Sequence, residues 1–381
     1  MPANMKSNRV DLSAIAYISE KDAKRLSKHL VKAGDILYSR RGDVTQKALI
    51  REAEAGYFCG TGCLLVRPGD AIDPEFLTYH LSTPTNQDWI VKQAVGATMP
   101  NLNTAILSAV PLNLPPNKDI QRRTAAILSA LDAKIDCNNR INAELEAMAK
   151  TLYDYWFVQF DFPDASGKPY KSSGGRMLYN SSLQQQIPLG WDVGIASDLF
   201  DFNPSLSLPK NTEASYIDMA ALPVSGFMTD APERKPFAGG MKFQNGDVIV
   251  ARITPCLENG KTALISLLKD KEIGFGSTEF IVIRGKESAL SAFAAQICRS
   301  IPFRNFAISN MTGTSGRKRI DAKTLANFPM PLPPENILLK YESLIHPFLE
   351  RMTVNAKENQ RLAQLRDWLL PLLMNGQVTV A

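Results

Sequence analysis

The fold is decided by a stretch of sequence that the chain contains twice. It reads AGDILYSRRGDVTQKALI at residues 33–50 and NGDVIVARITPCLENGKTALI at residues 245–265. Both versions contain Gly-Asp, an alternating apolar run, an arginine, a turn, a lysine and Ala-Leu-Ile. Their first glycines, Gly34 and Gly246, lie 212 positions apart. Each apolar run predicts a short β-strand that is bounded by turns.

Three further pairs of segments repeat in the same order along the chain. They are RVDLSAI at 9–15 with YIDMAAL at 216–222, GTGCLLVR at 60–67 with GSTEFIVIR at 276–284, and PLNLPP at 111–116 with PMPLPP at 329–334. Two ordered copies indicate a tandem duplication, because a solenoid array needs at least three repeats.

A long helix is predicted after the proline-rich strip in each copy. Apolar or amide residues recur along both helices with identical steps of three and four, at Leu128, Leu131, Ile135, Asn138, Asn142, Leu145, Met148, Leu152 and Tyr155, and at Ile345, Phe348, Met352, Asn355, Asn359, Leu362, Leu365, Leu369 and Leu372. This spacing is typical of a coiled-coil seam.

Four asparagines of the seam are the predicted helix-pairing residues, namely Asn138, Asn142, Asn355 and Asn359. If the helices pack antiparallel, Asn142 and Asn359 come face to face at the middle of the seam. A polar pair there costs stability but fixes register and orientation. The alternative is that each helix only covers its own domain.

These features predict an α+β fold with a pseudo-two-fold internal repeat, in which two long antiparallel coiled-coil helices separate two mixed α/β domains. The expected boundaries are 1–118 for the first domain, 119–158 for the first long helix, 159–187 for an extended linker, 188–335 for the second domain and 336–375 for the second long helix. The second domain opens with IPLGWDVGIASDLFDF, whose counterpart would precede residue 1. We therefore expect the first domain to be N-terminally shortened by about 20 residues.

Composition indicates a folded protein of the cytoplasm. Of the 381 residues, 45% are hydrophobic and 21% charged, and the net charge is +5, which fits a nucleic-acid partner without demanding one. The N-terminus lacks a secretory apolar region, and no apolar run approaches the ~20 residues of a membrane span. Five scattered cysteines argue for a reducing compartment, and Cys59 and Cys63 lack the further ligands of a zinc site, so we expect no metal.

Enzyme motifs are not supported by the sequence. Gly260-Lys261-Thr262 resembles the end of a P-loop, but Pro255 stands where its first glycine is required. No dinucleotide-binding glycine motif follows a strand, and three scattered histidines give no Ser-His-Asp set. We therefore predict no catalytic residues.

Basic and polar residues in the predicted loops are the candidate DNA contacts, because cations beside glycine turns can approach phosphates and base edges. In the first copy they are Arg40, Arg41 and Lys47, with Asn101 and Asn103 as possible base readers; in the second they are Arg252, Lys261, Thr312, Thr314, Ser315, Arg317, Lys318 and Arg319. Residues 96–102 (GATMPNL) correspond to residues 312–320 (TGTSGRKRI) without their charge. Divergent loops on a shared frame would suit two domains that read different sequences.

The chain resembles the specificity subunit of type I restriction-modification systems. The similarity is carried by the repeated Gly-Asp strand, the Pro-Leu-Pro-Pro strip, ITPCLENGKTALI at 253–265, LYDYWFVQFDFPDASGKPYKSSGGRM at 152–177 and RLAQLRDWLLPLLMNGQV at 361–378. It covers nearly the whole chain.

The resemblance implies a non-catalytic subunit that reads a bipartite site in double-stranded DNA. It implies binding of two adenine-methyltransferase (modification) subunits to the helices, with restriction subunits joining the complex. S-adenosylmethionine and ATP with Mg²⁺ are then expected on these partners and no cofactor on this chain. Two alternatives are a scaffold or inhibitor of the modification subunits that does not bind DNA, and a nuclease or methyltransferase with attached recognition domains.

Overall fold

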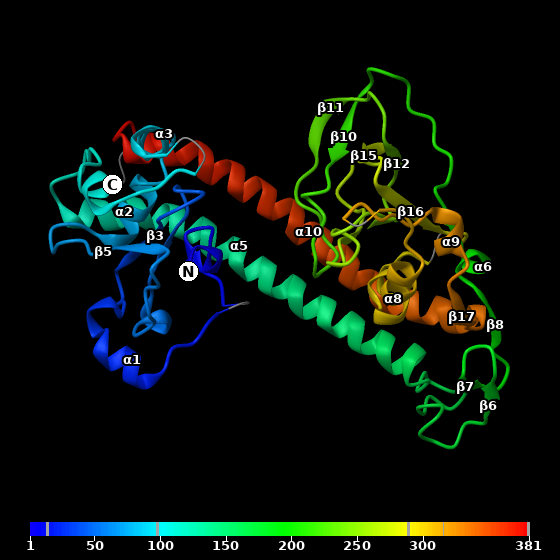
Figure 1. Ribbon diagram of the computed structural model, residues 1–381. Coiled ribbons are helices and arrows are strands. Elements are labelled where there is room, and N and C mark those ends of the chain that lie inside the picture. The colour runs from blue at the N-terminus through cyan, green and yellow to red at the C-terminus, as the bar shows by residue number, and fades with distance from the viewer. Residues whose placement is uncertain (13–14, 97–98, 288–289, 315, 379–381) are drawn as a thin grey trace. The chain divides into compact units, whose positions relative to one another are not determined.

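A computed structural model describes residues 1–12, 15–96, 99–287, 290–314 and 316–378 (Figure 1). The chain divides into two compact units, Met1–Ile135 with Arg361–Ala381, and Asp136–Gln360. Each unit holds one β-rich domain and one part of two long helices, α5 (Lys118–Tyr153) and α10 (Glu335–Met374).

The domain of the first unit is built on a three-stranded antiparallel sheet in the order β4-β3-β5, with β3 at Ile36–Ser39, β4 at Lys47–Leu49 and β5 at Cys63–Val66. Every residue of the central strand β3 is buried. The remaining regular elements are β1 (Met5–Lys6), β2 (Arg9–Val10), α1 (Glu20–Arg25), α2 (Pro74–His80), α3 (Pro84–Gln93) and α4 (Thr104–Ser108), with 3₁₀ turns at Pro2–Asn4, Ser27–His29 and Glu52–Glu54.

The domain of the second unit contains the same sheet with one strand more. Its order is β14-β13-β16-β9, with β9 at Phe200–Phe202, β13 at Val248–Ala251, β14 at Thr262–Leu264 and β16 at Phe280–Gly285. The registers agree, since Ile36 lies opposite Leu49 and Val66, and Val248 lies opposite Leu264 and Ile283. The two copies of the sequence repeat therefore form sheets whose equivalent strands pair in the same register.

A second four-stranded sheet, in the order β11-β10-β15-β12, belongs to the second unit. Its strands are β10 (Glu213–Ile217), β11 (Glu233–Pro236), β12 (Met241–Phe243) and β15 (Gly274–Gly276). The other elements of this unit are β6 (Met177–Asn180), β7 (Gln185–Pro188), β8 (Asp192–Ile195), α6 (Ala196–Leu199), α7 (Ser291–Arg299), α8 (Ile301–Ser309), α9 (Ala322–Ala326) and β17 (Pro329–Leu332).

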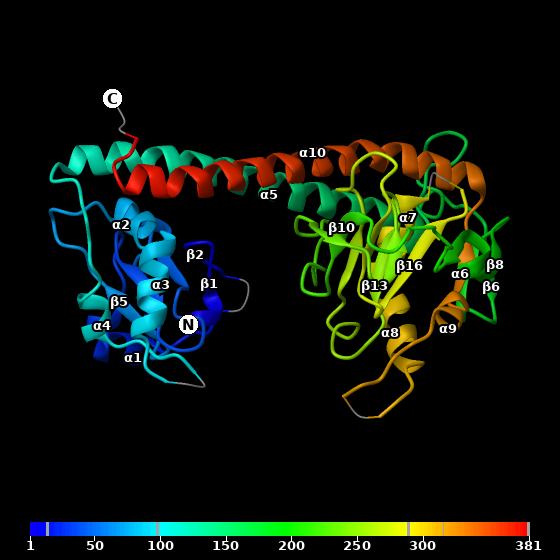
Figure 2. The ribbon, with the colours of Figure 1, turned by 90° about the horizontal axis from the view of Figure 1, so that it is seen from above.

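Each domain is attached to the long helices through the helix that follows its sheet (Figure 2). In the first unit, Phe76 and Tyr79 of α2 pack with Leu128 of α5 and Leu373 of α10, and the Tyr79 hydroxyl donates to Asp132 at 2.6 Å. In the second unit, Glu342 of α10 accepts the first N–H groups of α7, and its burial raises its pKa to about 7. Such contacts satisfy buried polar groups at the helix ends.

The long helices pack antiparallel in each unit. In the first unit the guanidinium of Arg366 donates to Asp132 at 2.8 Å, and in the second unit the Tyr341 hydroxyl donates to the Ala149 carbonyl at 3.2 Å. These contacts, with the two β-rich domains, confirm the predicted α+β fold.

The asparagines pair differently from the prediction. Asn355 donates from Nδ2 to Oδ1 of Asn142 at 2.8 Å, and Asn138 donates to Oδ1 of Asn359 at 2.9 Å. Asn142 therefore pairs with Asn355 and not with Asn359. In the antiparallel arrangement the first asparagine of α5 meets the second of α10, and the second of α5 meets the first of α10.

The outer parts of the predicted seam also differ. Met148, Tyr155 and Leu365 are exposed, whereas Ala149 and Leu370 are buried. An α-helix with 3.6 residues per turn drifts from a strict 3.5-residue repeat, so the contact positions move by one residue away from the asparagines.

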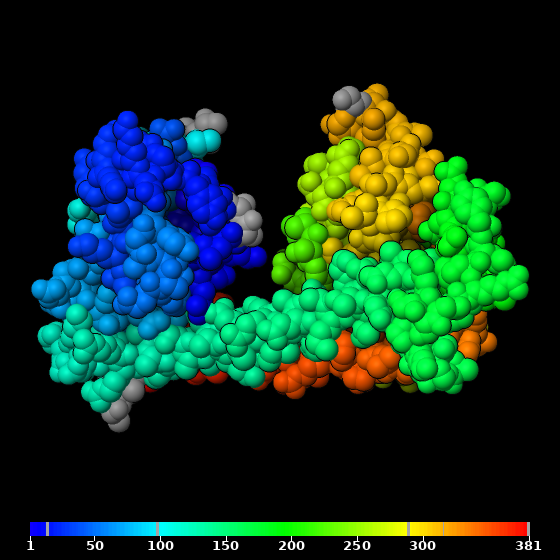
Figure 3. Space-filling view, turned by 90° about the horizontal axis from the view of Figure 1, so that it is seen from below, coloured from blue at the N-terminus to red at the C-terminus, as the bar shows by residue number. Residues whose placement is uncertain are grey.

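The segment 159–187 has more structure than the extended linker that was predicted. Strands β6 and β7 form a hairpin, and Phe160 and Phe162 are buried against Trp191 with ring centroids 5.4 and 5.3 Å away. In Figure 3 this green segment lies directly against the end of α5 and the second domain. The glycines and serines of this segment predicted an extended linker. The segment is instead packed against the second domain, because its phenylalanines bury apolar surface there.

Candidate nucleic-acid interface

An arginine binds a buried aspartate at the start of the central strand in each domain. Arg67 donates from Nε and Nη2 to the two carboxylate oxygens of Asp35, both at 2.7 Å, and Arg284 binds Asp247 with the same atoms and distances. The two aspartates are almost fully buried. Paired hydrogen bonds from guanidinium to carboxylate hold both groups in one orientation, so the strand ends are rigid in both domains.

The residues of this pair recur at matching positions in both copies of the sequence repeat. The aspartate belongs to the repeated Gly-Asp, and the arginine ends both GTGCLLVR and GSTEFIVIR. A matched acid and base in two copies predicts a structural ion pair, and its two members lie on neighbouring strands.

The candidate loops leave each domain at the same point of this frame. In the first domain Val95 and Asn101 exchange backbone hydrogen bonds at 3.0 Å, and Leu102 N–H donates to the Arg40 carbonyl at 2.9 Å. In the second domain, Thr312 and Arg319 exchange them at 2.8 Å. Ile320 N–H then donates to the Arg252 carbonyl at 3.0 Å. The loops thus differ in sequence but not in attachment.

The loop of the second domain carries the exposed charge. Thr312, Thr314, Arg317 and Lys318 are exposed, and within the described residues neither Arg317 nor Lys318 has an ion-pair partner. Ser315 lies outside the described residues. These side chains can reach an anionic partner without first breaking an internal contact.

Arg319 differs from its two neighbours because it already has a partner. It binds Glu279 through Nε at 2.9 Å and Nη2 at 2.7 Å, and its Nη1 donates to the Arg317 carbonyl at 3.3 Å. Hydrogen bonds from Arg319 hold the pKa of Glu279 below its usual value, and the charge of Arg252 adds to this effect. Arg319 therefore shapes the loop and offers less free charge than the sequence suggested.

Two polar candidates of the first domain, Asn101 and Asn103, are partly buried or bound to the backbone of their own domain. Arg41 is exposed, but Asn101 is half-buried, and its Oδ1 is buried without a hydrogen-bond partner in the described residues. Asn103 caps helix α4 by accepting Ile106 N–H at 2.9 Å, as Asp321 does for α9 with Thr324 N–H. Asn103 thus has a structural role that explains its presence.

Lys47 was predicted as a loop cation that follows the turn, but it is the first residue of a strand. It lies in β4 with 3% of its surface exposed and its Nζ 5.8 Å from the centre of the Tyr38 ring. Burial lowers its pKa to about 8, partly opposed by Asp43. Strand register makes Lys47 equivalent to Thr262, not to Lys261, because the lysine stands one position closer to Ala-Leu in the first copy.

Lys261 is also tied to its own domain. Its Nζ donates to the Met219 carbonyl at 2.6 Å, and its carbonyl accepts Ala251 N–H at 3.0 Å. This contact joins the end of β13 to the segment after β10, so Lys261 is less available to an external anion than the residues of the loop.

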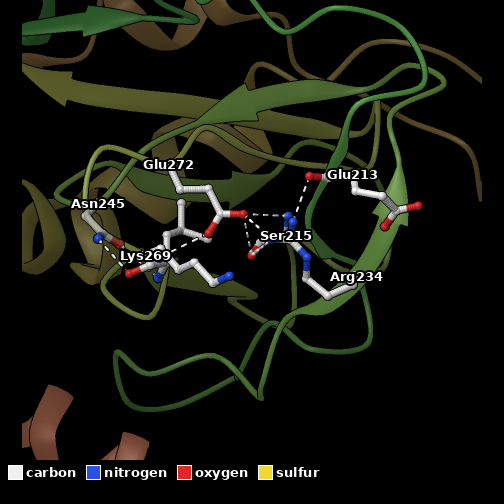
Figure 4. A network of polar contacts seen from close by, with 7 residues as sticks. Glu213, Ser215, Arg234, Asn245, Lys269 and Glu272 are labelled. Atoms are coloured by element: carbon white, nitrogen blue, oxygen red, sulfur yellow. Dashed lines mark hydrogen bonds and ion pairs between the residues drawn. The ribbon is translucent and has the colours of Figure 1, made fainter.

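A further polar network holds the edge strand β11 in the second domain (Figure 4). Arg234 of β11 bonds to Glu272 and donates from Nη2 to the Glu213 carbonyl at 2.7 Å. Glu272 also accepts from Ser215 at 3.1 Å and from Lys269 N–H at 3.0 Å. This network was not predictable from the sequence, because its members come from three separate segments that share no motif.

Comparison with known proteins identifies the family. The family described as type I restriction modification DNA specificity domain matches residues 4–147 and 188–366. The chain belongs to this family of type I specificity subunits. It is a DNA specificity subunit, the non-catalytic part of a type I restriction-modification enzyme.

Several specificity subunits resemble it over most of their length. The MjaIX specificity subunit of Methanocaldococcus jannaschii is 23% identical, over 95% of this chain and 82% of its own. The HindI specificity subunit of Haemophilus influenzae is 22% identical, over 94% and 89%. The crystal structure of an S subunit from M. genitalium shares 16% identity with a TM-score of 0.50 over 91% of this chain and 84% of that one, which supports the fold.

The described part of the specificity subunit contains neither a candidate membrane span nor a candidate metal site. No helix there is both long and apolar enough to cross a membrane. No group of three or more histidine, cysteine or acidic side chains there could hold a metal ion, and Cys59 and Cys63 are free thiols.

Proposed function

We propose that each domain of the specificity subunit reads one half of a bipartite site in double-stranded DNA. The observation that carries this proposal is the shared attachment of two different loops. Both domains have the same strand register and the same aspartate–arginine pair, while residues 95–101 contain no cation and residues 312–319 contain three. A constant frame with variable loops suits the reading of two different sequences.

The proposed contacts are the candidate residues that no ion pair or helix cap holds in the described part of the chain, together with Ser315, which lies outside it. They are Arg40, Arg41 and Asn101 in the first domain and Arg252, Thr312, Thr314, Ser315, Arg317 and Lys318 in the second. Arg319 is proposed to position the second loop, while Lys47, Lys261 and Asn103 have internal roles. The domain boundaries stated above, with recognition domains at 1–118 and 188–335, remain part of this proposal.

The long helices are the proposed assembly surface. Two modification subunits, which are adenine methyltransferases, would bind to α5 and α10, and restriction subunits would join them in the cytoplasm. S-adenosylmethionine would be bound by the modification subunits, and ATP with Mg²⁺ by the restriction subunits. The exposed apolar side chains Met148, Leu339, Leu344, Val354 and Trp368 on the two helices support a protein partner there.

Co-expression with a type I modification methyltransferase from the same organism tests the proposal. Methylated adenines are then mapped in the host DNA, with a strain that expresses the methyltransferase alone as the control. We expect one motif of two separated half-sites. Methylation of a single continuous motif, or identical methylation without this chain, would contradict the proposal.

A second candidate is a scaffold that occupies modification subunits without reading DNA. It is favoured by the first domain, whose loop at 95–101 is uncharged and whose strip at 111–114 pairs with no strand of the described residues, unlike β17, which pairs with β8. Such a scaffold would bind the methyltransferase but direct no site-specific methylation in the same experiment.

A further inference from the structure

Arg40 and Arg252 occupy the same position in the two domains. Each directly follows the central strand, and each donates its backbone N–H to the neighbouring segment, Arg40 to the Gly62 carbonyl at 2.9 Å and Arg252 to the Glu279 carbonyl at 3.0 Å. Each also accepts, through its carbonyl, the N–H that follows the variable loop. Both arginines are therefore fixed at the base of their loop.

The side chains of Arg40 and Arg252 share one arrangement. Both side chains are half-buried, and both Nε atoms are buried without a hydrogen bond. Within the described residues, no carboxylate binds the rest of either guanidinium. Arg67, Arg284 and Arg319 in contrast all have a carboxylate partner.

The packing of the stem has an energetic consequence. A surface arginine loses side-chain entropy when it is immobilised by a ligand, whereas a stem that is already packed has lost part of it on folding. A half-buried guanidinium that no carboxylate hydrogen-bonds also gains more from an external anion than a fully solvated one does. Glu279 and Asp321 lie near enough to Arg252 for its charge to lower their pKa values, but neither binds its guanidinium. The two arginines are thus prepared to bind an anion.

From this equivalence we infer that Arg40 and Arg252 are a matched pair of DNA phosphate anchors, one at the base of each loop. They position each domain on the duplex and do not discriminate between sequences. This inference rests on the proposed function and deepens it. It distinguishes the residues that determine the affinity for DNA from the loops that determine which DNA sequence is recognised.

Phosphate is the favoured ligand because the two positions are alike while the two loops differ. A residue that is held at the same backbone position in both domains is not where the two domains differ, and the sugar-phosphate backbone is the part of DNA that is the same in both half-sites. Arginine binds phosphate with its planar fork and keeps its charge at all accessible pH values.

The test uses the full chain in complex with its methyltransferase. Arg40→Gln and Arg252→Gln keep most of the stem while removing the charge. Arg176→Gln is the control, because Arg176 is exposed directly before β6 and lies outside the long helices and the proposed DNA contacts. Binding to a duplex with the mapped site and to a scrambled duplex is measured at several KCl concentrations. Arg40→Lys and Arg252→Lys are measured alongside, because lysine retains the charge for a phosphate contact but loses the fork for a guanine contact.

We expect each Gln variant to weaken binding to both duplexes by a similar factor, about fivefold to tenfold near 0.1 M salt. The slope of log K against log salt should decrease by about 1 per variant, with Lys restoring most of the affinity and the control unchanged. Unchanged affinity and slope in either Gln variant would overturn the inference. Loss confined to the site duplex would also overturn it and assign base reading to the arginines. If the unmodified complex does not prefer the site duplex, the proposed function itself fails.

Discussion

Asn355 of α10 and Asn142 of α5 hydrogen-bond to each other across the helix pair of the second unit, with Nδ2 of Asn355 donating to Oδ1 of Asn142 at 2.8 Å. Asn355 is completely buried, so its amide has no access to water. A second pair, Asn138 with Asn359, lies one step along the helices. Two amide pairs in succession, each with one fully buried asparagine, favour one register, because a shift of one helix would break both hydrogen bonds.

A double-mutant cycle tests the Asn142–Asn355 pair. Asn142→Leu alone leaves the buried Asn355 amide without its acceptor and should lower the free energy of unfolding by about 1–3 kcal/mol. The double variant Asn142→Leu/Asn355→Leu should recover most of this loss or exceed the original stability, since two apolar side chains replace both partners. Urea denaturation followed by circular dichroism measures the cycle. Additive losses would show that the two side chains do not interact.

The repeat and the long helices were predictable because their signals are local. Apolar strands such as residues 36–39, and steps of three and four around Asn142, depend on neighbours in sequence, and both appear in the structure. Side-chain environments were less predictable. Lys47 looked like a loop cation, but one residue of strand register decided that it lies inside the sheet. Arg319 looked free, but Glu279, 40 residues away, binds it. Partners this distant leave no pattern in a single sequence.

The aspartate–arginine pairs should contribute unequally to stability. Asp247→Ala leaves Arg284, whose side chain is 23% exposed, without a counter-ion, whereas Asp35→Ala leaves Arg67, which is 48% exposed and solvated. We expect a loss of about 3 kcal/mol for Asp247→Ala and of about 1–2 kcal/mol for Asp35→Ala, because solvent compensates the more exposed arginine. Thermal and urea unfolding of the two variants give the comparison. Equal losses would show that the exposure of the arginine does not govern the cost.

The buried Lys47 should make the first unit more stable at high pH. Its pKa is about 8 when folded against an ordinary value of 10.5, so between these values the unfolded chain binds a proton that the folded chain does not. Stability therefore rises with pH from about 8 to 10.5 and is lowest, by about 3 kcal/mol at most, below pH 8. Lys47→Met lacks this penalty, and part of its gain is offset by the lost contact with the Tyr38 ring.

The difference in unfolding free energy between Lys47→Met and the natural chain is the quantity to measure, because titrations of all other groups cancel in it. We expect the variant to be more stable at pH 7 and the difference to narrow steadily between pH 8 and 10.5. A difference that is constant over this range would mean that Lys47 keeps its ordinary pKa in the folded protein.

The two free cations of the second loop should contribute to DNA binding through charge alone. Arg317→Glu with Lys318→Glu reverses two exposed charges that have no partner within the described residues, so the fold should be preserved. Binding to any duplex should weaken, and the slope of log K against log salt should fall by about 2, since about one counterion is released per neutralised phosphate. Filter binding or fluorescence anisotropy over a range of salt concentrations measures both quantities.

Lys269→Glu with Lys271→Glu is the control, because these two lysines are equally exposed in the same unit but lie in the turn before β15. We expect a smaller effect from it, owing to the change in net charge alone. Equal losses from both double variants would assign the effect to net charge and remove the loop from the interface.

A third variant, Arg319→Ala, separates the shape of the loop from its charge, because it removes the ion pair with Glu279 that holds the loop. Arg319→Ala should change the preference between the site duplex and the scrambled duplex. The Arg317→Glu/Lys318→Glu variant should instead weaken binding to both duplexes by a similar factor.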